Sequence, residues 1–438
     1  MSVEYITLFM FGSMIILLMT GRHIFLVIGG VGTIAALALW GTGAENMAFS
    51  AAFSFIKWYQ LLAIPPFIFM GLILAGSGVA DKLYDAMGMW FGPVRGGLGV
   101  ITVVICALFA AMEGLTVAAT VTSGTIALPS MLKRNYDKSL AVGVTLSAGT
   151  LSIVIPPSII FILYGVIAHV SIGHLWIAGI LPGALMASFF VVYILIRAKI
   201  QPNIAPALHT DSVITWKRKF IALRDGVAPL VIIFMVLGLL FAGVTTIIEC
   251  SAIAAVMALA AAAINKKLTM NLLISAIDQT FTASCMIMWI FVSALFFAAI
   301  YDGLGAVEVI KPMFDTLAAG NPLVMIIFMI VTFIIMGAFL DDTAMLLIVA
   351  PLYIPLVQDA GFSLVWFGVL YTLTCQIAYI TPPFGYNLFI LKSVVPKDIS
   401  LTDIYKASLP FVVLLSIVLL VVLFIPQIAT WLPSIYAN

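Results

Sequence analysis

The chain has 438 residues, of which 64% are apolar and only 8% are charged, and its mean hydropathy is +1.25. Soluble domains carry roughly 25% charged residues, so this composition excludes a protein that faces water on all sides. The apolar residues form long continuous runs and not short alternating segments, which predicts an all-α polytopic membrane protein and argues against a β-barrel. The net charge of +1 does not indicate a nucleic-acid partner, and we expect none.

The first part of the chain contains three apolar runs that approach the roughly 20 residues needed to cross a bilayer. They are Ile6–Thr20, Ile24–Trp40 and Trp58–Ser77. The first run starts without a basic leader, so we interpret it as a retained span and not as a cleaved signal peptide. Asp81–Phe91 is amphipathic and too polar to cross, so we expect it to lie along the membrane interface.

Two short apolar arms follow, joined at a polar centre around Glu113. Together they cover Leu98 to Leu132, and arms of roughly 15 residues are short for a full crossing. We therefore predict a re-entrant hairpin with its tip near Glu113. Two full crossings would return the chain to the same side, so membrane orientation alone does not separate the two possibilities.

An apolar run from Ala141 to Ala168 is interrupted by Pro156-Pro157. Neither proline has an N–H to donate, and each disfavours helix in the residue before it, so the pair must break the helix. The carbonyls that such a break frees have no water in hydrocarbon, so they must be buried in protein or line a site. A second run, Leu364–Leu391, is interrupted in the same way at Pro382-Pro383. Two such breaks indicate the site of a transporter.

The remaining predicted elements complete two similar halves. They are the spans Leu175–Ile196, Val227–Val244, Glu249–Ile264, Ser284–Ile300 and Leu409–Leu432, an interfacial helix over Asp302–Leu317, and a second hairpin over Pro322–Val357 with a polar centre at Asp341-Asp342. We divide the chain into scaffold helices (1–96), a first repeat core (97–196), a cytoplasmic link (197–225), second scaffold helices (226–321) and a second repeat core (322–438).

Three prolines of the first half recur in the second half 226 residues later: Pro129, Pro156 and Pro157 correspond to Pro355, Pro382 and Pro383. If the N-terminus is outside, only Lys57 and Lys311 of the 19 basic residues lie on the exterior, as the positive-inside rule requires. The two hairpins then open to opposite sides of the membrane. This pattern predicts an inverted-topology repeat with a binding site near the middle of the bilayer.

The segments around the breaks, together with the residues that follow the first one, resemble the large membrane subunit of TRAP (tripartite ATP-independent periplasmic) transporters. The matching segments are Ala148–Ser158, Val170–Leu175, Ala178–Gly183 and Tyr379–Gly385, and the resemblance covers nearly the whole chain. It implies Na+-coupled uptake of a small organic acid across the inner membrane, with a periplasmic N-terminus. It also implies two protein partners, a periplasmic substrate-binding protein and a small four-helix membrane subunit, and a mobile elevator domain built from the hairpins and broken helices.

The resemblance also implies the residues of the site. One Na+ would bind carbonyls around Ser152, Ile155 and Pro157 and be closed by the first hairpin tip with Glu113 and Gly114; the second would use Gly337, Ala378, Thr381 and Phe384. The carboxylate substrate would lie between the tips near Thr116, Asp341, Asp342 and Asn387, facing half-helix N-termini. Helix-break carbonyls suit Na+ because they supply oxygen ligands without adding a charge. No organic cofactor is expected.

The first hairpin tip departs from the family pattern. The family usually has Ser-Gly-Ser there, whereas this chain has Glu113-Gly114-Leu115. Glu113 either replaces a lost hydroxyl as ion ligand, or exchanges a proton during coupling, or is a tip residue near water without such a role. At the second tip, we expect one of Asp341 and Asp342 to cap the following helix and the other to be a candidate for facing the site.

Two other functions were weighed against TRAP-type transport. A stand-alone Na+- or H+-coupled anion or dicarboxylate transporter of related fold would not need the binding protein. An intramembrane enzyme would need a catalytic set within the spans, but the sequence has no HExxH motif and its four histidines lie at span ends or in loops. We therefore expect a transporter and not an enzyme.

Overall fold

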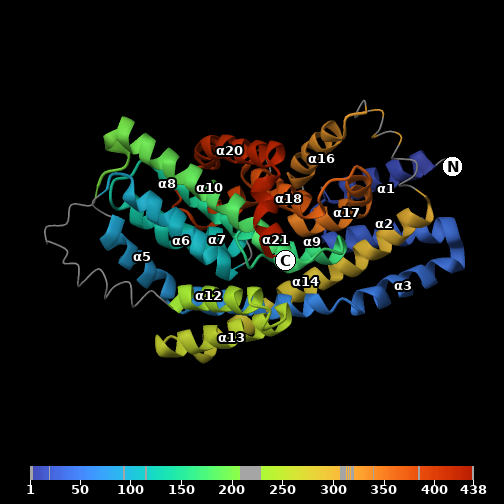
Figure 1. Ribbon diagram of the computed structural model, residues 1–438, viewed down its shortest axis with the longest axis horizontal. Coiled ribbons are helices and arrows are strands. Elements are labelled where there is room, and N and C mark those ends of the chain that lie inside the picture. Colours follow the sequence, from blue (N-terminus) through green and yellow to red (C-terminus); the bar gives the residue numbers. More distant parts are fainter. Residues whose placement is uncertain are drawn as a thin grey trace.

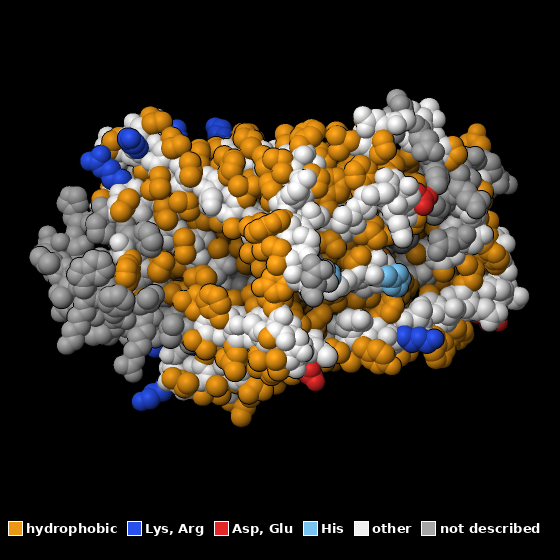
Figure 2. All heavy atoms as spheres, in the orientation of Figure 1, with side chains coloured by type: hydrophobic (Ala, Val, Ile, Leu, Met, Phe, Trp, Pro, Cys, Tyr) orange, Lys and Arg blue, Asp and Glu red, His pale blue; other side chains and the backbone are white. Residues whose placement is uncertain are grey.

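The computed structural model describes the chain except at residues 1–2, 19, 92–93, 114–115, 208–227, 306–311, 313, 315, 317–319, 339, 383–384 and 437–438. The described residues fold into helices, most of them elongated along a common direction (Figure 1). Six helical segments are long and apolar enough to cross a membrane: Ile24–Ile56, Tyr59–Gly76, Ile172–Ile200, Ile247–Ile264, Met270–Tyr301 and Leu401–Phe424. Hydrophobic side chains cover much of the visible surface (Figure 2), as expected for a chain surrounded by lipid.

The N-terminal helices are α1 (Val3–Leu18), α2 (Ile24–Trp40), α3 (Ala44–Ile56), α4 (Ile64–Gly76) and α5 (Val79–Phe91), with 3-10 turns η1 (Gly41–Gly43) before α3 and η2 (Tyr59–Ala63) before α4. Our sequence analysis missed α3. The sequence Gly41-Thr42-Gly43 suggests a loop, but these residues form the 3-10 turn η1, which connects α2 directly to α3.

The next group is α6 (Gly97–Glu113), α7 (Thr116–Leu132), α8 (Lys138–Thr150), η3 (Leu151–Ile153), α9 (Ile159–Ile167), α10 (Ile172–Ile200) and η4 (Pro202–Ile204). The second half contains α12 (Ala228–Phe241), α13 (Ile247–Ile264), α14 (Met270–Gly303), α16 (Pro322–Gly337), α17 (Asp342–Asp359), α18 (Leu364–Ile380), α19 (Tyr386–Val394), α20 (Leu401–Phe424) and α21 (Gln427–Tyr436). Both predicted helix breaks are present, between Thr150 and Ile159 and between Ile380 and Tyr386.

Three predicted elements of the second half differ from the structure or fall outside it. The predicted span Ser284–Ile300 is present but too short, because α14 is one helix of 34 residues that also includes the mixed segment around Asp278. The single final span Leu409–Leu432 is also wrong, because α20 ends at Phe424, just before Pro426, and α21 follows. Most of the predicted interfacial helix Asp302–Leu317 lies outside the described residues.

Small residues allow the scaffold helices to pack closely. Ala254 and Ala258 of α13 are buried one turn apart, and α13 packs against α4. Gly29 of α2 faces Ser293 of α14, whose Oγ would lie 3.1 Å from a Cβ at the glycine. In the view of Figure 1, α12, α13 and α14 lie on one side of the molecule and α20 lies on the other, with the broken helices between them.

Candidate functional site

The first break is a buried, non-helical turn between α8 and α9. Ser158 begins α9: its hydroxyl accepts a hydrogen bond from Phe161 N at 3.4 Å and donates one to the Ile153 carbonyl at 2.6 Å. Ser152 is fully buried, and its hydroxyl donates to the Gly149 carbonyl at 3.0 Å. Ser152 and Ser158 therefore hold the turn on both sides of the Pro156-Pro157 pair.

Some carbonyls of this turn are paired and others are not. The carbonyl of Leu151 accepts from two backbone N–H groups, and the carbonyl of Ser158 accepts from Trp176 Nε1 at 3.2 Å. The carbonyls of Ser152, Ile155 and Pro157, the three expected around the first cation, receive no hydrogen bond from any residue that the structure describes. Buried carbonyls are normally paired, so these three oxygens are free to bind a ligand.

The second break also folds tightly, around Gly385. A Cβ at this glycine would lie 2.6 Å from the Tyr379 carbonyl and 2.9 Å from the Thr381 carbonyl, so a larger residue would not fit. Thr381 O already accepts from Gly385 N at 3.1 Å, and Ala378 O accepts from Thr381 N at 3.3 Å. Phe384 and Pro383 lie outside the described residues.

The structure brings Gly337 and Ala378 together. A Cβ at Gly337 would lie 2.6 Å from the Cβ of Ala378, which shows that the end of α16 contacts α18 just before the second break. Gly337 and Ala378 belong to different helices and are both expected in the second cation site, and the fold places them side by side.

The second hairpin tip is held against α18 by two tyrosines. Asp341 caps α17 by accepting from Ala344 N at 2.9 Å, which confirms that one of the two acids has a capping role. The backbone of Asp342 makes two bonds to α18: its N–H donates to the Tyr379 hydroxyl at 3.0 Å, and its carbonyl accepts from the Tyr371 hydroxyl at 2.5 Å. Our sequence analysis missed Tyr371 and Tyr379, although their spacing of eight residues places them near one face of a helix.

The first hairpin tip is described only in part. Glu113 ends α6, but its side chain, Gly114 and Leu115 lie outside the described part of the structure. Thr116 begins α7 and is 4% exposed. The tip therefore adjoins a buried helix start, and the roles of Glu113 stay predictions.

Asn387 lies in the first turn of α19 and is fully buried, and neither its Oδ1 nor its Nδ2 has a hydrogen-bond partner among the described residues. Gln376 on α18 has the same properties at both of its side-chain polar atoms, and so has the Thr120 hydroxyl on α7. The sequence analysis selected Asn387 but missed Gln376 and Thr120, because only the fold shows which buried polar groups lack partners.

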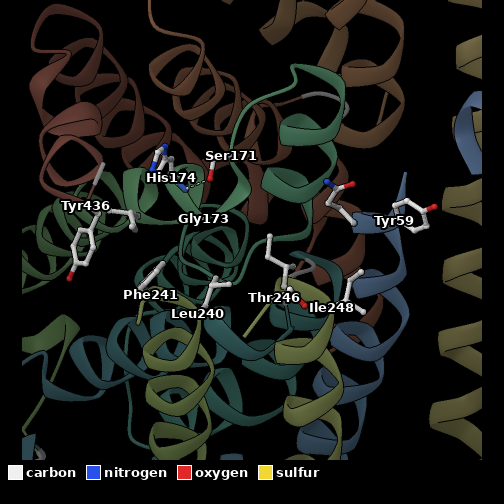
Figure 3. Close-up of a pocket in the computed structure, with 12 residues that line it drawn as sticks. Tyr59, Ser171, Gly173, His174, Leu240, Phe241, Thr246, Ile248 and Tyr436 are labelled. Atoms are coloured by element: carbon white, nitrogen blue, oxygen red, sulfur yellow. Dashed lines mark hydrogen bonds between the residues drawn. The ribbon is translucent and has the colours of Figure 1, made fainter. Parts of the chain in front are cut away.

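A separate cavity of about 520 Å³ opens between the scaffold helices and the start of α10 (Figure 3). Its lining comes from five elements: Tyr59 and Gln60 of η2, Ser171, Gly173, His174 and Ile177 at α10, Leu240 and Phe241 of α12, Thr246, Ile247 and Ile248 at α13, and Tyr436 of α21. None of the residues expected to bind cation or substrate lines this cavity, so it is distinct from the site at the breaks.

Sequence comparisons identify relatives over nearly the whole chain. A model of the DctM component of the tripartite ATP-independent periplasmic transporter matches residues 11–428. The C4-dicarboxylate TRAP transporter large permease protein DctM of Vibrio cholerae is 30% identical over 425 residues, with 91% of each chain covered. The ectoine TRAP transporter large permease protein TeaC of Halomonas elongata is 28% identical, with 97% of this chain and 98% of the relative covered.

Two solved transporter structures share the fold. The YdaH transporter of Alcanivorax borkumensis aligns over 88% of this chain and 89% of its own with a TM-score of 0.61 and 14% identity. MtrF of Neisseria gonorrhoeae aligns over 90% of this chain and 85% of its own with a TM-score of 0.59 and 13% identity. At such low identity these likenesses show the architecture alone.

Proposed function

Because the chain belongs to the DctM family of large permease subunits of TRAP transporters, we propose that it carries a small organic acid into a bacterial cell together with Na+. The chain is thus a multi-pass transport permease and not an enzyme. The observation that carries the Na+ part of the proposal is the set of unpaired carbonyls at the first helix break. In hydrocarbon such oxygens are costly unless they bind something, and Na+ is a suitable occupant.

In this proposal, the first Na+ binds the carbonyls of Ser152, Ile155 and Pro157. The second binds where Gly337 meets Ala378, with the carbonyls of Thr381 and Phe384. Support for the second position comes from the close contact of α16 with α18 and from the carbonyls of Ala378 and Thr381, each of which accepts one backbone bond at the helix end from the residues that the structure describes. Each carbonyl oxygen has two lone pairs, so one such bond leaves room for a cation.

The substrate carboxylate lies between the two hairpin tips in this proposal. Thr116 is at the first position of α7, so N–H groups at this helix start can face an anion. At the start of α17, by contrast, the N–H groups of Asp342, Thr343 and Ala344 already donate to Tyr379, Asp342 and Asp341. Asp341 borders the same place, and Asn387 contributes an unpaired amide. Glu113 closes the first tip as an ion ligand or exchanges a proton.

We further propose that residues 97–196 and 322–438 are inverted repeats that form the mobile domain, with residues 1–96 and 226–321 as scaffold. Helix boundaries support the repeat: α7 and α17 begin at residues 116 and 342, and α8 and α18 begin at residues 138 and 364, both 226 residues apart. The second halves of the two broken helices, α9 and α19, are each nine residues long.

The proposed orientation places the N-terminus in the periplasm, and the chain in the inner membrane with a small four-helix subunit and a periplasmic binding protein as partners. In Figure 2, Lys and Arg side chains gather mainly toward the end of the molecule where α8 starts and α13 ends. The positive-inside rule assigns this end to the cytoplasm. The cavity of Figure 3 then opens toward the periplasm, where the binding protein delivers substrate.

Reconstitution tests this function directly. The chain, its small subunit and its binding protein are placed in proteoliposomes, and uptake is measured with an inward Na+ gradient or with Na+ replaced by K+ or choline. We expect uptake only with Na+, and undiminished uptake in K+ would refute Na+ coupling. Omitting the binding protein should stop uptake, whereas continued uptake would identify a stand-alone carrier.

A further inference from the structure

Three polar side chains that are fully buried in the described part of the protein lack hydrogen-bond partners there. Thr120, Gln376 and Asn387 are each 0% exposed, and their hydroxyl or both amide atoms are unpaired among the described residues. Buried polar groups without partners are rare because each has lost its bonds to water without replacement. Neighbouring buried threonines do have partners: Thr372 Oγ1, for example, donates to Gly368 O at 2.9 Å.

Thr120 of α7 packs against the end of α8, beside the first helix break. Its Oγ1 is 2.6 Å from where a Cβ on Gly149 would be, and Gly149 precedes the last residue of α8. Three residues further along α7, the Ser123 hydroxyl donates to Thr145 O, one turn earlier in α8, at 3.1 Å. The two helices are therefore antiparallel, and Thr120 faces the part of α8 nearest the break.

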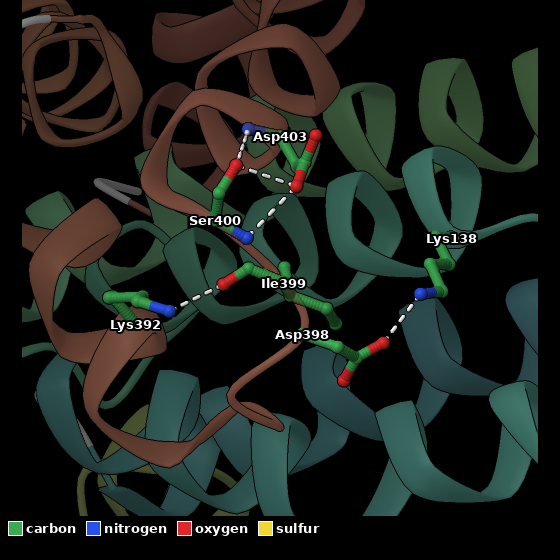
Figure 4. Close-up of polar contacts among 6 residues, drawn as sticks. All are labelled: Lys138, Lys392, Asp398, Ile399, Ser400 and Asp403. Atoms are coloured by element: carbon green, nitrogen blue, oxygen red, sulfur yellow. Dashed lines mark hydrogen bonds and ion pairs between the residues drawn. The ribbon is translucent and has the colours of Figure 1, made fainter.

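Asn387 lies at the same depth as Thr120. Lys138, the first residue of α8, pairs with Asp398, four residues beyond the end of α19, so α19 runs toward the same end of the molecule as α7 (Figure 4). Where these two parallel helices pack, Leu391 Cδ1 would be 3.0 Å from a Cβ at Gly124. One turn back from Gly124 and Leu391 are Thr120 and Asn387, so these two residues are level across the helix pair.

Gln376 lies level with the first break. The Tyr164 hydroxyl of α9 donates to Leu364 O at 2.7 Å, and the Tyr164 ring would be 2.6 Å from a Cβ at Gly368. Ile167 at the end of α9 lines one cavity with Leu364 at the start of α18, and α18 also contacts η3, which precedes α9, so α9 and α18 are antiparallel neighbours. From Gly368, eight residues of helix carry α18 about 12 Å past Tyr164, to Gln376. Since α9 begins five residues before Tyr164, Gln376 is beside the turn that precedes α9.

The same short segment of backbone connects these positions. Both α8 and η3 contact α7 and α18, and α8 also contacts α19; these three helices carry Thr120, Gln376 and Asn387. The unpaired groups thus surround the end of α8, where the unpaired Ser152 carbonyl also lies.

The chemistry of these groups restricts what can satisfy them. A carboxylate only accepts hydrogen bonds, so it can pair with amide N–H groups but not with amide oxygens. Gln376 Oε1 and Asn387 Oδ1 need a hydrogen-bond donor or a cation. Because the proposed Na+ ions bind main-chain carbonyls, the donor role falls to the substrate. We propose that Thr120, Gln376 and Asn387 contact the transported substrate, and that this substrate carries neutral hydroxyl donors on its carbon chain besides its carboxylate. This inference rests on the proposed function, and it favours a hydroxylated organic acid over a plain dicarboxylate.

Binding to the membrane complex alone tests this preference, because the binding protein has a selectivity of its own. The chain is purified with its small subunit, and ligand affinity is obtained from the shift of the thermal unfolding midpoint in Na+. The probes are two pairs matched in carbon number and charge, galactarate with adipate and tartrate with succinate. In at least one pair the hydroxylated acid should bind about tenfold or more tightly than its plain partner, since a site built for hydroxyl groups rejects analogues that lack them.

Isosteric variants identify the contacts. Gln376→Met, Asn387→Leu and Thr120→Val should each weaken binding of the hydroxylated acid about tenfold or more beyond any effect on the plain acid, and so reduce the preference by that factor. Without ligand, these variants should unfold at the same or a higher temperature than the parent, because each removes an unpaired buried polar group. Thr372→Val is the matched control, because it removes a paired hydroxyl from α18, the helix that carries Gln376. It should lower the unfolding temperature slightly and keep the preference for the hydroxylated acid.

Equal affinity for both members of each pair would overturn the inference. So would variants that lower the ligand-free unfolding temperature as Thr372→Val does and keep the preference, because the three groups would then have partners in the resting protein. If uptake in the reconstituted system did not depend on Na+, the coupling proposal would be refuted, but the preference for hydroxylated acids would not be affected.

Discussion

At the two helix breaks, the close approach of neighbouring backbone segments decides which residue can occupy a given position. Gly337 and Gly385 have no room for a side chain, because a Cβ at either would lie 2.6 Å from an atom of α18. Asp341 and Ser158 close the ends of α17 and α9 by capping, which fixes where each helix begins beside the site. Most of the proposed chemistry therefore uses backbone groups whose positions depend on small or capping residues.

Gly337→Ala tests the contact between α16 and α18. The added methyl group must push α16 away from Ala378, which should destabilise the protein by about 1–3 kcal/mol. The same displacement should weaken Na+ binding, measured as the Na+ concentration for half-maximal uptake. Gly30→Ala in α2 is the control, since nothing lies within 4 Å of its Cβ position and alanine favours helix. Equal behaviour of the two variants would contradict the tight contact.

Asp341 variants separate capping from charge. Asparagine caps a helix as well as aspartate does, so Asp341→Asn should keep the unfolding temperature, whereas Asp341→Ala should lose about 1 kcal/mol. If the charge also faces the site, both variants should lose Na+ or substrate affinity. Normal transport by Asp341→Asn would limit this residue to a structural role.

Glu113→Gln addresses the first hairpin tip. The substitution keeps the size and removes the charge, so either functional role predicts a change in the Na+ or pH dependence of uptake. The measurement is uptake over a range of external pH at fixed Na+ gradient. Unchanged profiles would show that Glu113 is a tip residue without a part in coupling.

Among the elements, the second hairpin is the part most clearly attached to its neighbour. The hydroxyls of Tyr371 and Tyr379 bind the backbone of Asp342 from the last three turns of α18, so the tip and the second break form one unit. This arrangement makes the position of the tip depend on the helix whose end is proposed to bind Na+. Movement of the tip and occupation of the second cation site should therefore be coupled.

Tyr379→Phe tests that coupling. Loss of the hydroxyl removes one hydrogen bond worth about 1 kcal/mol and should loosen the tip. Hydrogen exchange at residues 340–344 should accelerate, and the Na+ requirement for uptake should rise. Tyr353→Phe is the control, because this hydroxyl pairs with Thr332 between the arms and not at the tip. Faster exchange at the tip in both variants would indicate general loosening.

At the scale of the whole molecule, the proposed orientation rests on the distribution of basic residues. Lys57 follows α3, and Lys267 follows α13. The proposed orientation places the first of these ends in the periplasm and the second in the cytoplasm. The orientation therefore decides to which side of the membrane each of the two helix breaks opens.

Cysteine labelling in cells tests the orientation. A membrane-impermeant maleimide should label Lys57→Cys from the periplasm, and Lys267→Cys only after the inner membrane is permeabilised. The parent chain is the control: Cys106, Cys250 and Cys375 are buried and Cys285 is half-buried, so its labelling should be weak. The reverse pattern would invert the proposed topology.

The sequence by itself determined the class of protein, both helix breaks and the cap at Asp341. Each of these follows from local chemistry: apolar composition requires a membrane, paired prolines cannot continue a helix, and aspartate readily accepts N–H bonds at a helix start. The recurring prolines are 226 residues apart, and the starts of α7 and α17 and of α8 and α18 have the same spacing.

Only the tertiary structure decided which helices are neighbours. It joined α14 into one helix and added α3, because packing against other helices outweighs the polar or glycine residues that suggested loops. It also placed Tyr371 and Tyr379 on Asp342 and aligned Thr120 with Asn387. Contacts of this kind join residues from 29 to 260 positions apart, and no local pattern in the chain encodes such distances, so they emerge only when the helices pack.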